Sequence, residues 1–323
     1  MKIVAWGIGS HAQRNTLPAL MKTVPIDVVG IYSRNDEIVR EQARKYGCKP
    51  YTNSEILLAD PEIEGVYLAT PIALHFSEGR KILEAGKHLF VEKSSVMCLR
   101  DAEILAELAK SNNLVIAECF MYKHHNQCAK LLDIIRNEEL GAIRQIYACF
   151  GFPHLNANDI RYRKKLGGGA LLDAGAYTLS LAALFAKNSI NLCSATMFTQ
   201  KSYDVDTDGV ATLILDGYIS FIASWGMGRG YRNEVEVWGE NGTAYAYRFF
   251  SKPETLETNI KILKQNSECI IKCPPENHFV SMFRDFTKAV DDVELRSFFR
   301  NNFIEQASLV ENVLNASINL RST

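Results

Sequence analysis

The sequence has no surplus of either charge, because 36 Lys and Arg residues nearly balance 37 Asp and Glu residues and leave a net charge of −1. Such a balance offers no general electrostatic attraction to nucleic acid. The basic residues form no stripe interleaved with aromatic residues, and we interpret the run RKK (163–165) as a solvated loop. We therefore expect no nucleic-acid partner.

The sequence also lacks long hydrophobic runs. We find no apolar stretch near the roughly 18 residues that a membrane helix needs. The first ten residues, MKIVAWGIGS, hold a short apolar stretch that runs into glycines and is too short for a signal peptide. These observations predict a cytoplasmic protein without a membrane partner.

Paired cysteine motifs are missing as well. Eight cysteines are scattered through the chain, and the closest pair, in CIIKC (269–273), has no second Cys or His pair to complete a zinc site. His124 and His125 have no carboxylate or cysteine at ligand spacing. We predict reduced cysteines, as in a cytoplasmic protein, and no metal.

What the sequence does contain is a regular alternation over its first 120 residues. The 323 residues suffice for two domains. Near-continuous apolar runs alternate with segments whose apolar residues are three or four apart, which predicts buried parallel strands joined by helices. The runs are KIVAW, DVVGIYS, GVYLAT, HLFVE and LVIAE. Residues 1–120 are therefore predicted to form a dinucleotide-binding Rossmann domain with a doubly wound parallel sheet.

The pattern changes after residue 120. Strands follow one another without helices between them, which predicts an open, mostly antiparallel sheet and an α+β domain over residues 121–323. Helices are expected near 124–137, 276–292 and 302–319, and the last of these is a candidate to pack back on the first domain. A further apolar helix is opened by GGGALLDAGAY (167–177).

A dinucleotide motif directly follows the first predicted strand. Its glycines allow a tight turn and a close backbone approach to the pyrophosphate, and its last position needs a small residue for helix–strand packing. The motif comprises Gly7, Ile8, Gly9, Ser10, His11 and Ala12.

The second strand ends in Ser33 and Arg34, where an NAD site would carry an acidic residue. A hydroxyl and a guanidinium suit a 2′-phosphate, so we expect NADP(H) rather than NAD(H). A surface arginine before a helix is the alternative interpretation.

Polar residues stand where two other predicted strands end. In HLFVEKSSV (88–96), Glu92 and Lys93 follow an apolar run, and Thr70 and Pro71 follow the preceding strand. Ligands of a doubly wound sheet bind beyond the carboxyl ends of its strands. We therefore expect Lys93 to project into that crevice near the nicotinamide.

These motifs together resemble the Gfo/Idh/MocA oxidoreductases over essentially the whole chain. The resemblance implies that Lys93 contacts nicotinamide and substrate, that Glu92 faces the cofactor and that His75 lies near it. It also implies that Asp173 and Tyr177 bind substrate and move the proton. Tyrosine rather than histidine at the last position resembles an NADP-using branch that contains nucleotide-sugar ketoreductases and dimeric dihydrodiol dehydrogenase.

The resemblance extends to further segments. ECFMYKHH implies a substrate-side role for Tyr122, and NDIRYR implies an anion contact for Arg161, with a surface salt bridge as the alternative. Asp206, in DVDTD, is interpreted as structural. The stretch 228–253 resembles the corresponding stretch of nucleotide-sugar ketoreductases, and the family implies a homodimer or homotetramer through the second-domain sheet.

The chemistry of these residues fits a carbonyl reduction. Asp173 and Tyr177 are four apart on a predicted helix and are expected to face the same side. Glycines at the start of that helix would let a ligand come close. A phenol has an ordinary pKa of about 10, which a neighbouring ammonium lowers. We therefore expect Tyr177 to move the proton, Lys93 to stabilise the alkoxide and Asp173 to orient a hydroxyl of a sugar-like substrate.

Three departures from the family pattern keep other functions open. Ser94 replaces the proline after Lys93, Ile72 replaces an asparagine, and Lys123 replaces an arginine. A trans-dihydrodiol or aldose dehydrogenase is the alternative enzyme. A regulatory protein that senses NADP without turnover is the alternative of another class.

Overall fold

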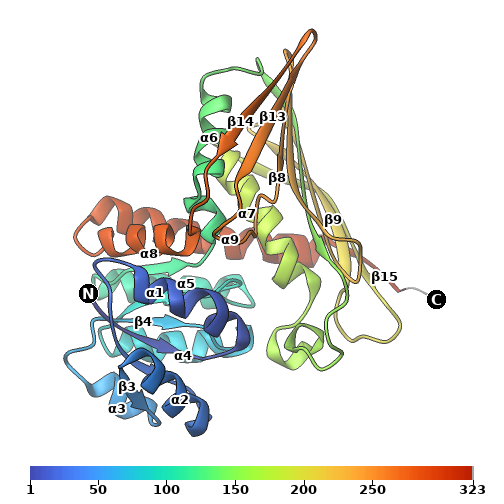
Figure 1. Cartoon of the computed structure of the whole chain (residues 1–323). Helices are drawn as coiled ribbons and strands as arrows, with labels where there is room; N and C mark the ends of the chain where they lie inside the picture. The colour runs from blue at the N-terminus through green and yellow to red at the C-terminus, as the bar shows by residue number, and fades with distance from the viewer. Residues whose placement is uncertain (322–323) are drawn as a thin grey trace. The chain divides into compact units, whose positions relative to one another are not determined.

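The computed structural model describes residues 1–321, which divide into two compact units (Figure 1). Unit 1 contains residues 1–120 and 279–307. Unit 2 contains residues 121–278 and the residues from 308 onward. Residues 279–307 follow the second sheet in sequence and nevertheless belong to the unit of the first sheet.

Unit 1 is built on a six-stranded parallel sheet with the order β3-β2-β1-β4-β5-β6. Its connections change direction between β1 and β4, so the carboxyl ends of those strands border the crevice where a dinucleotide binds in such folds. The predicted doubly wound Rossmann sheet is confirmed. Its strands are β1 (Lys2–Trp6), β2 (Asp27–Tyr32), β3 (Lys49–Tyr51), β4 (Gly65–Leu68), β5 (His88–Val91) and β6 (Ile116–Glu118).

Helices complete the layers of unit 1, and their starts follow from local capping. The Asn35 side chain accepts hydrogen bonds from two backbone N–H groups of α2, and Asp292 caps α9, which therefore begins nearer the preceding helix than the expected residue 302. The helices are η1 (Ala12–Thr16, π-type), α1 (Leu17–Lys22), α2 (Asp36–Tyr46), α3 (Ser54–Ala59), α4 (Ile72–Glu84), α5 (Leu99–Ser111), α8 (His278–Lys288) and α9 (Val293–Ala316).

The core of unit 1 explains why α8 and most of α9 belong to it. Phe283 of α8 packs edge-on against Tyr67 of β4, with ring centroids 5.5 Å apart. Phe286 lies 5.3 Å from Phe90 of β5 by the same measure. Phe303 of α9 is 1% exposed within the apolar cluster of the first sheet. Burial of these aromatic side chains joins the end of the chain to its beginning.

Unit 2 contains a nine-stranded mixed sheet with the order β14-β13-β12-β11-β7-β10-β9-β8-β15. The pairs β7–β10 and β8–β15 are parallel and the others are antiparallel, which confirms the predicted mostly antiparallel sheet. The strands are β7 (Ile143–Phe152), β8 (Ile190–Thr199), β9 (Asp208–Leu215), β10 (Ile219–Met227), β11 (Arg232–Gly239), β12 (Thr243–Tyr247), β13 (Thr258–Lys264), β14 (Ser267–Cys273) and β15 (Ile318–Arg321).

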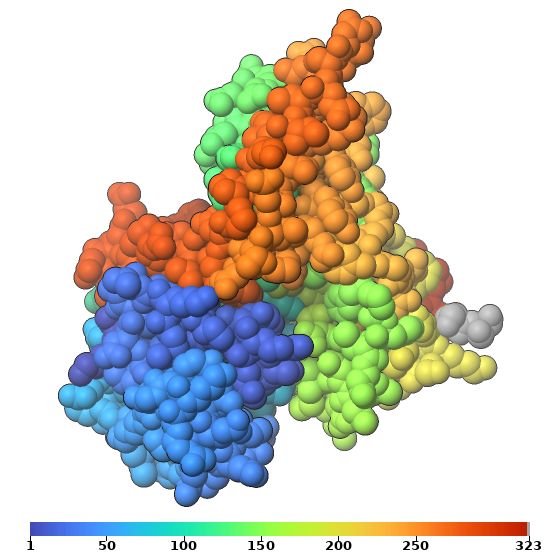
Figure 2. Space-filling model, in the orientation of Figure 1, coloured from blue at the N-terminus to red at the C-terminus, as the bar shows by residue number. Residues whose placement is uncertain are grey.

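Helices cover one face of this second sheet (Figure 1). They are η2 (Met121–His124), α6 (Asn126–Arg136), η3 (Ile160–Tyr162), η4 (Lys164–Leu166), η5 (Leu171–Gly175, π-type) and α7 (Ala176–Phe185). The opposite face leaves large apolar side chains exposed, among them Val210, Trp238, Tyr247, Leu263 and Ile270. In Figure 2 the hairpin of β13 and β14 forms the orange tip of this unit.

Candidate active site

The Gly-rich turn after β1 leaves an open space at one glycine and none at the other. Gly7 has φ +98°, and a Cβ there would lie 2.7 Å from the backbone of Ala69. A Cβ on Gly9 would meet nothing within 4 Å. Gly7 is therefore required by the tight turn, whereas the space at Gly9 is the kind of cradle that a pyrophosphate needs. Ala12 is 3% exposed and begins the π-type segment η1.

The end of β2 presents Ser33 and Arg34 beside the same crevice border. The hydroxyl oxygen of Ser33 accepts a hydrogen bond from the backbone of Asn35 (3.3 Å), and Arg34 is exposed at the start of α2. The exposed guanidinium can bind an added phosphate through parallel hydrogen bonds.

The carboxylate of Glu78, on helix α4, lies beside the residues that follow β4, and no sequence motif indicated it. The Thr70 hydroxyl donates to Glu78 of α4 (2.5 Å), and Pro71 is the N-cap residue of that helix. Burial raises the pKa of Glu78, while the hydrogen bond from Thr70 and the charge of Arg34 act in the opposite direction. Only the three-dimensional contact with Thr70 points to this residue, because Glu78 stands in an ordinary amphipathic helix.

The turn that carries Lys93 is anchored on both sides. The peptide bond between Lys93 and Ser94 is cis. The carbonyl oxygen of Ser94 lies 3.0 Å from Nδ1 of His75, and the backbone N–H of Ser95 donates to Glu118 (2.8 Å). These contacts fix the backbone from which the Lys93 side chain projects.

His75 is 1% exposed, and its Nε2 lies 2.7 Å from the carbonyl oxygen of Thr70. Burial lowers the pKa of His75, and a neutral imidazole can donate to only one of its two carbonyl neighbours. His75 therefore links the loop after β4 to the Lys93 turn, and this buried position argues against direct contact with a cofactor.

In unit 2, Asp173 is held by an arginine. Nε of Arg161 donates to Asp173 (2.7 Å), and Nη1 of Arg161 donates to Asp159 (3.2 Å). The charge of Asp173 is the main reason why the pKa of Arg161 is raised. Because one guanidinium is shared by two carboxylates, Arg161 orients Asp173 here rather than offering an unpaired positive charge to an anion.

The glycines before Asp173 serve packing rather than ligand approach. A Cβ on Gly168 would lie 2.5 Å from the carbonyl oxygen of Arg161, and one on Gly169 would lie 2.3 Å from the Asp206 carboxylate. The helix that follows begins as the π-type segment η5. The expected i, i+4 relation between Asp173 and Tyr177 assumes α-helical geometry, which does not hold through this segment.

Tyr177 is 5% exposed and lies in a group of aromatic rings. Its ring centroid is 5.1 Å from that of Phe150 in a T-shaped contact, and its hydroxyl donates to Sδ of Met121 (3.4 Å). Tyr122 is fully buried, and its hydroxyl pairs with that of Ser180 (2.8 Å), which argues against the expected contact of Tyr122 with substrate. The Ser180 hydroxyl also donates to the Tyr177 carbonyl (2.9 Å), so Tyr122 supports the backbone of the candidate proton donor.

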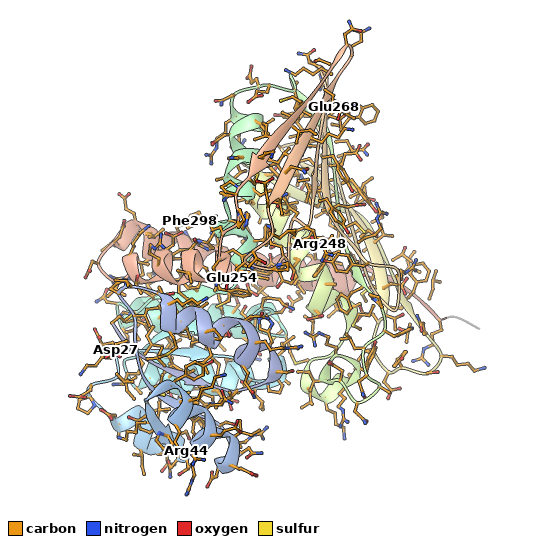
Figure 3. All side chains as sticks on the ribbon, viewed as in Figure 1. Asp27, Arg44, Arg248, Glu254, Glu268 and Phe298 are labelled. Atoms are coloured by element: carbon orange, nitrogen blue, oxygen red, sulfur yellow. The ribbon has the colours of Figure 1, made fainter. Side chains whose placement is uncertain are left out.

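The segment after β12 supplies further rings of this group. Phe249 and Phe250 pack against Tyr122, and their backbone is held by the fully buried Asn233, whose Oδ1 accepts from the N–H of Phe250 (2.7 Å). Lys252 is 7% exposed and donates to the carbonyl of Phe249 (2.8 Å). Burial lowers the pKa of Lys252 to about 7. Arg248, labelled in Figure 3, precedes this segment.

Other features of the described residues lie apart from the predicted site. A cavity of about 240 Å³ is lined by Cys149, Val210, Ser224 and Arg229, whose register places it at the uncovered face of the second sheet. Within residues 1–321, no three His, Cys, Asp or Glu side chains gather so that they could hold a metal ion, and no cysteine forms a disulfide. The helical segment 164–185 is long and apolar enough to resemble a membrane helix, but 67% of its most apolar stretch is buried, as in a core helix.

Comparison with known proteins agrees with this combination of a dinucleotide fold and a second, mixed-sheet unit. Residues 1–120 match the oxidoreductase family with an NAD-binding Rossmann fold, and residues 128–245 match the GFO/IDH/MocA C-terminal domain. The chain belongs to the Gfo/Idh/MocA oxidoreductase family.

Its relatives include dTDP-3,4-didehydro-2,6-dideoxy-alpha-D-glucose 3-reductases. The chain is 31% identical to that of Streptomyces antibioticus, over 95% of this chain and 94% of the relative. Identity to that of Saccharopolyspora spinosa is 30%, over 96% of each.

The structure of KijD10, a 3-ketoreductase from Actinomadura kijaniata in complex with NADP and TDP-benzene, matches with a TM-score of 0.96 and 29% identity, covering 100% of this chain and 99% of that one. Matching structures also include a tyrosine-to-phenylalanine and a lysine-to-alanine variant of KijD10, both with NADP and TDP-benzene.

Proposed function

We propose that this protein is an NADP(H)-dependent reductase of a keto group on a dTDP-linked deoxysugar. The observation that carries the proposal is the identity of 30% or more to 3-reductases of such sugars over at least 95% of the chain. Residues 1–120 would hold the dinucleotide, and residues from 121 onward would hold the sugar nucleotide. The nucleotide sugar is favoured over a free aldose or a dihydrodiol because the nucleotide-sugar 3-reductases are the relatives that match this chain over most of its length.

The residues of unit 1 fit the cofactor. The open space at Gly9 accommodates a pyrophosphate, and the exposed Arg34 suits the 2′-phosphate that distinguishes NADP from NAD. When bound, the cofactor supplies the hydride. Thr70 and Pro71 at the end of β4, and Glu92 and Lys93 at the end of β5, would border its nicotinamide end.

The residues of both units then complete the reduction. Tyr177 gives its phenolic proton to the carbonyl oxygen as the carbon gains hydride, so the ketone becomes a secondary alcohol, and solvent returns a proton to the phenolate. Lys93 stabilises the negative charge that develops on that oxygen. Asp173, oriented by Arg161, accepts a hydrogen bond from a neighbouring sugar hydroxyl. A lysine and a tyrosine are also the residue types that are changed in two KijD10 variants.

A turnover assay tests the proposal. We expect the wild-type protein to consume NADPH, measured by absorbance, in the presence of dTDP-3,4-didehydro-2,6-dideoxyglucose. Tyr177→Phe and Lys93→Ala should each lower kcat by about 100-fold or more, whereas Tyr218→Phe, in a surface turn, should not. Tight NADPH binding without oxidation by this sugar, other keto sugars or dihydrodiols would favour the regulatory alternative.

We further propose a homodimer or homotetramer in the cytoplasm. The support is the uncovered face of the second sheet, where Trp238 is 55% exposed and Ile270 is 55% exposed. A large exposed apolar patch on a sheet is typical of an interaction surface, and the resemblance to the family implies assembly through this sheet.

A further inference from the structure

The carboxylate of Glu92 belongs to a hydrogen-bond network inside unit 1. Oη of Tyr67, in the middle of β4, lies 2.6 Å from Oε1 of Glu92 and 2.8 Å from Oγ1 of Thr16. A phenol has a single proton. When Tyr67 donates that proton to the carboxylate, the Thr16 hydroxyl must donate to the phenol oxygen, so the three groups form one directed chain.

The central member of this network is rigid. Tyr67 and Thr16 are both fully buried, and the Tyr67 ring packs edge-on against Phe283. Burial, together with the neighbouring charge of Glu92, raises the pKa of Tyr67 well above its ordinary value, so the phenol remains a proton donor. Hydrogen bonds from a neutral donor to a buried carboxylate are among the stronger ones in proteins.

The network joins two parts of the proposed cofactor site. Thr16 ends the π-type segment of the helix that follows the Gly-rich turn, and His11, at the start of that helix, has Nε2 3.9 Å from Oε1 of Glu92. The other carboxylate oxygen of Glu92 accepts from the backbone N–H of Lys93 (3.3 Å). The position of Glu92 thus depends on the dinucleotide helix on one side and influences the Lys93 turn on the other.

We propose that Tyr67 is a positioning residue for the reaction, which fixes the Glu92 carboxylate and thereby the side chain of Lys93. The proposal rests on the function proposed above, because it assumes that Lys93 acts on the substrate. Without the phenol hydroxyl, the carboxylate loses its buried donor and can rotate, which loosens its hydrogen bond with the backbone N–H of Lys93. The Lys93 side chain is then no longer held in one position relative to the developing alkoxide.

The chain contains a matched control for Tyr67. Tyr51 of β3 is 4% exposed in the same unit, and its hydroxyl donates to the carboxylate of Asp60 (2.7 Å), with no connection to Glu92 in the described residues. We expect Tyr67→Phe to lower kcat about tenfold or more, the worth of one charge-assisted hydrogen bond, with KM for sugar and NADPH changed by less than about threefold. Tyr51→Phe should leave kcat unchanged while lowering the unfolding temperature similarly. Thr16→Val should lower kcat in the same direction by less, and it replaces Tyr67→Phe if the latter does not fold.

A second measurement needs no substrate. Acetylation of Lys93 by trace acetic anhydride at mildly alkaline pH, quantified by mass spectrometry, should change in rate about twofold or more in Tyr67→Phe but not in Tyr51→Phe, because the surroundings of the Lys93 amine change with the turn that carries it. A changed acetylation rate in Tyr67→Phe without wild-type turnover would support the role of Tyr67 and contradict the proposed function. Two results would overturn the role of Tyr67 through Glu92. In the first, the wild type turns over and the kcat of Tyr67→Phe equals that of Tyr51→Phe. In the second, kcat falls in Tyr67→Phe while the acetylation rate of Lys93 stays unchanged.

Discussion

At the scale of single residues, neighbouring side chains decide which of the chemically capable groups are available. Arg161 has the charge to bind an anion, but it is shared between Asp159 and Asp173. Tyr122 has a phenol, but that phenol is engaged by Ser180 inside the core. Arg34, by contrast, is exposed beside the end of β2. Of these three residues, Arg34 is therefore the one that the fold leaves uncovered for an anionic group of a cofactor.

This contrast predicts the effect of changing Arg34. Arg34→Ala should raise KM for NADPH about tenfold or more, because a hydrogen-bonded ion pair with the 2′-phosphate is lost. KM for NADH should change by less than about twofold, since NADH lacks that phosphate. Steady-state kinetics with both cofactors measure the difference, and Arg44→Ala on helix α2, which begins just after Arg34, serves as control (Figure 3). An equal effect on both cofactors would contradict the role of Arg34.

At the scale of secondary-structure elements, the helix after the Gly-rich turn and the helix that carries Asp173 and Tyr177 both begin with a π-type segment. Segment η1 (Ala12–Thr16) follows the Gly-rich turn, and η5 (Leu171–Gly175) contains Asp173. Such segments are rare and often mark functional sites. In each case the extra residue of the π turn changes the angular spacing of the side chains along the helix.

The start of the second of these helices depends on Asp206. Its carboxylate accepts from the N–H of Leu171 (2.6 Å), and burial raises its pKa to about 6. Between the ordinary pKa and about 6, the folded chain keeps a proton that the unfolded chain releases. The contribution of Asp206 to stability therefore falls as the pH rises through this window and stays low above it.

Asp206→Asn should remove this pH dependence while retaining an oxygen acceptor for Leu171. We expect the unfolding temperature of Asp206→Asn, relative to wild type, to rise between about pH 4 and pH 6. Asp216→Asn is a control of opposite sign at lower pH: backbone hydrogen bonds from residues 187–189 lower the pKa of Asp216, so its contribution to stability is lost as the pH falls below its ordinary pKa. Parallel thermal melts of the wild type and both variants measure this, and an unchanged slope for Asp206→Asn would contradict the assignment.

At the scale of the whole molecule, the uncovered face of the second sheet exposes large apolar side chains that a single chain does not bury. Strand register places Trp238 beside Thr243 and, one strand further, Leu263, so these side chains share that face. Burying such a surface against a second copy removes apolar area from water. The proposed oligomer accounts for side chains that would otherwise remain exposed.

Trp238→Glu should therefore shift the protein towards the monomer. A charge buried at an interface without a partner weakens association strongly, so light scattering after gel filtration should report at least a halved mass. Ile56→Glu, at an exposed position on α3 in unit 1, controls for a general effect of added charge. A monomeric wild type would contradict the proposed assembly.

The sequence by itself determined the Rossmann sheet, the mostly antiparallel second sheet and the family, because these depend on local periodicity and on short motifs such as Gly7 to Ala12. The roles of Gly168 and Gly169 could not be predicted, since the contacts that require them come from the Arg161 backbone across an irregular segment and from Asp206, which is distant in sequence. The same holds for Glu78, Tyr67 and the buried setting of Tyr122. Hydrogen bonds between distant residues leave no periodic trace in the chain, and only the tertiary structure decides them.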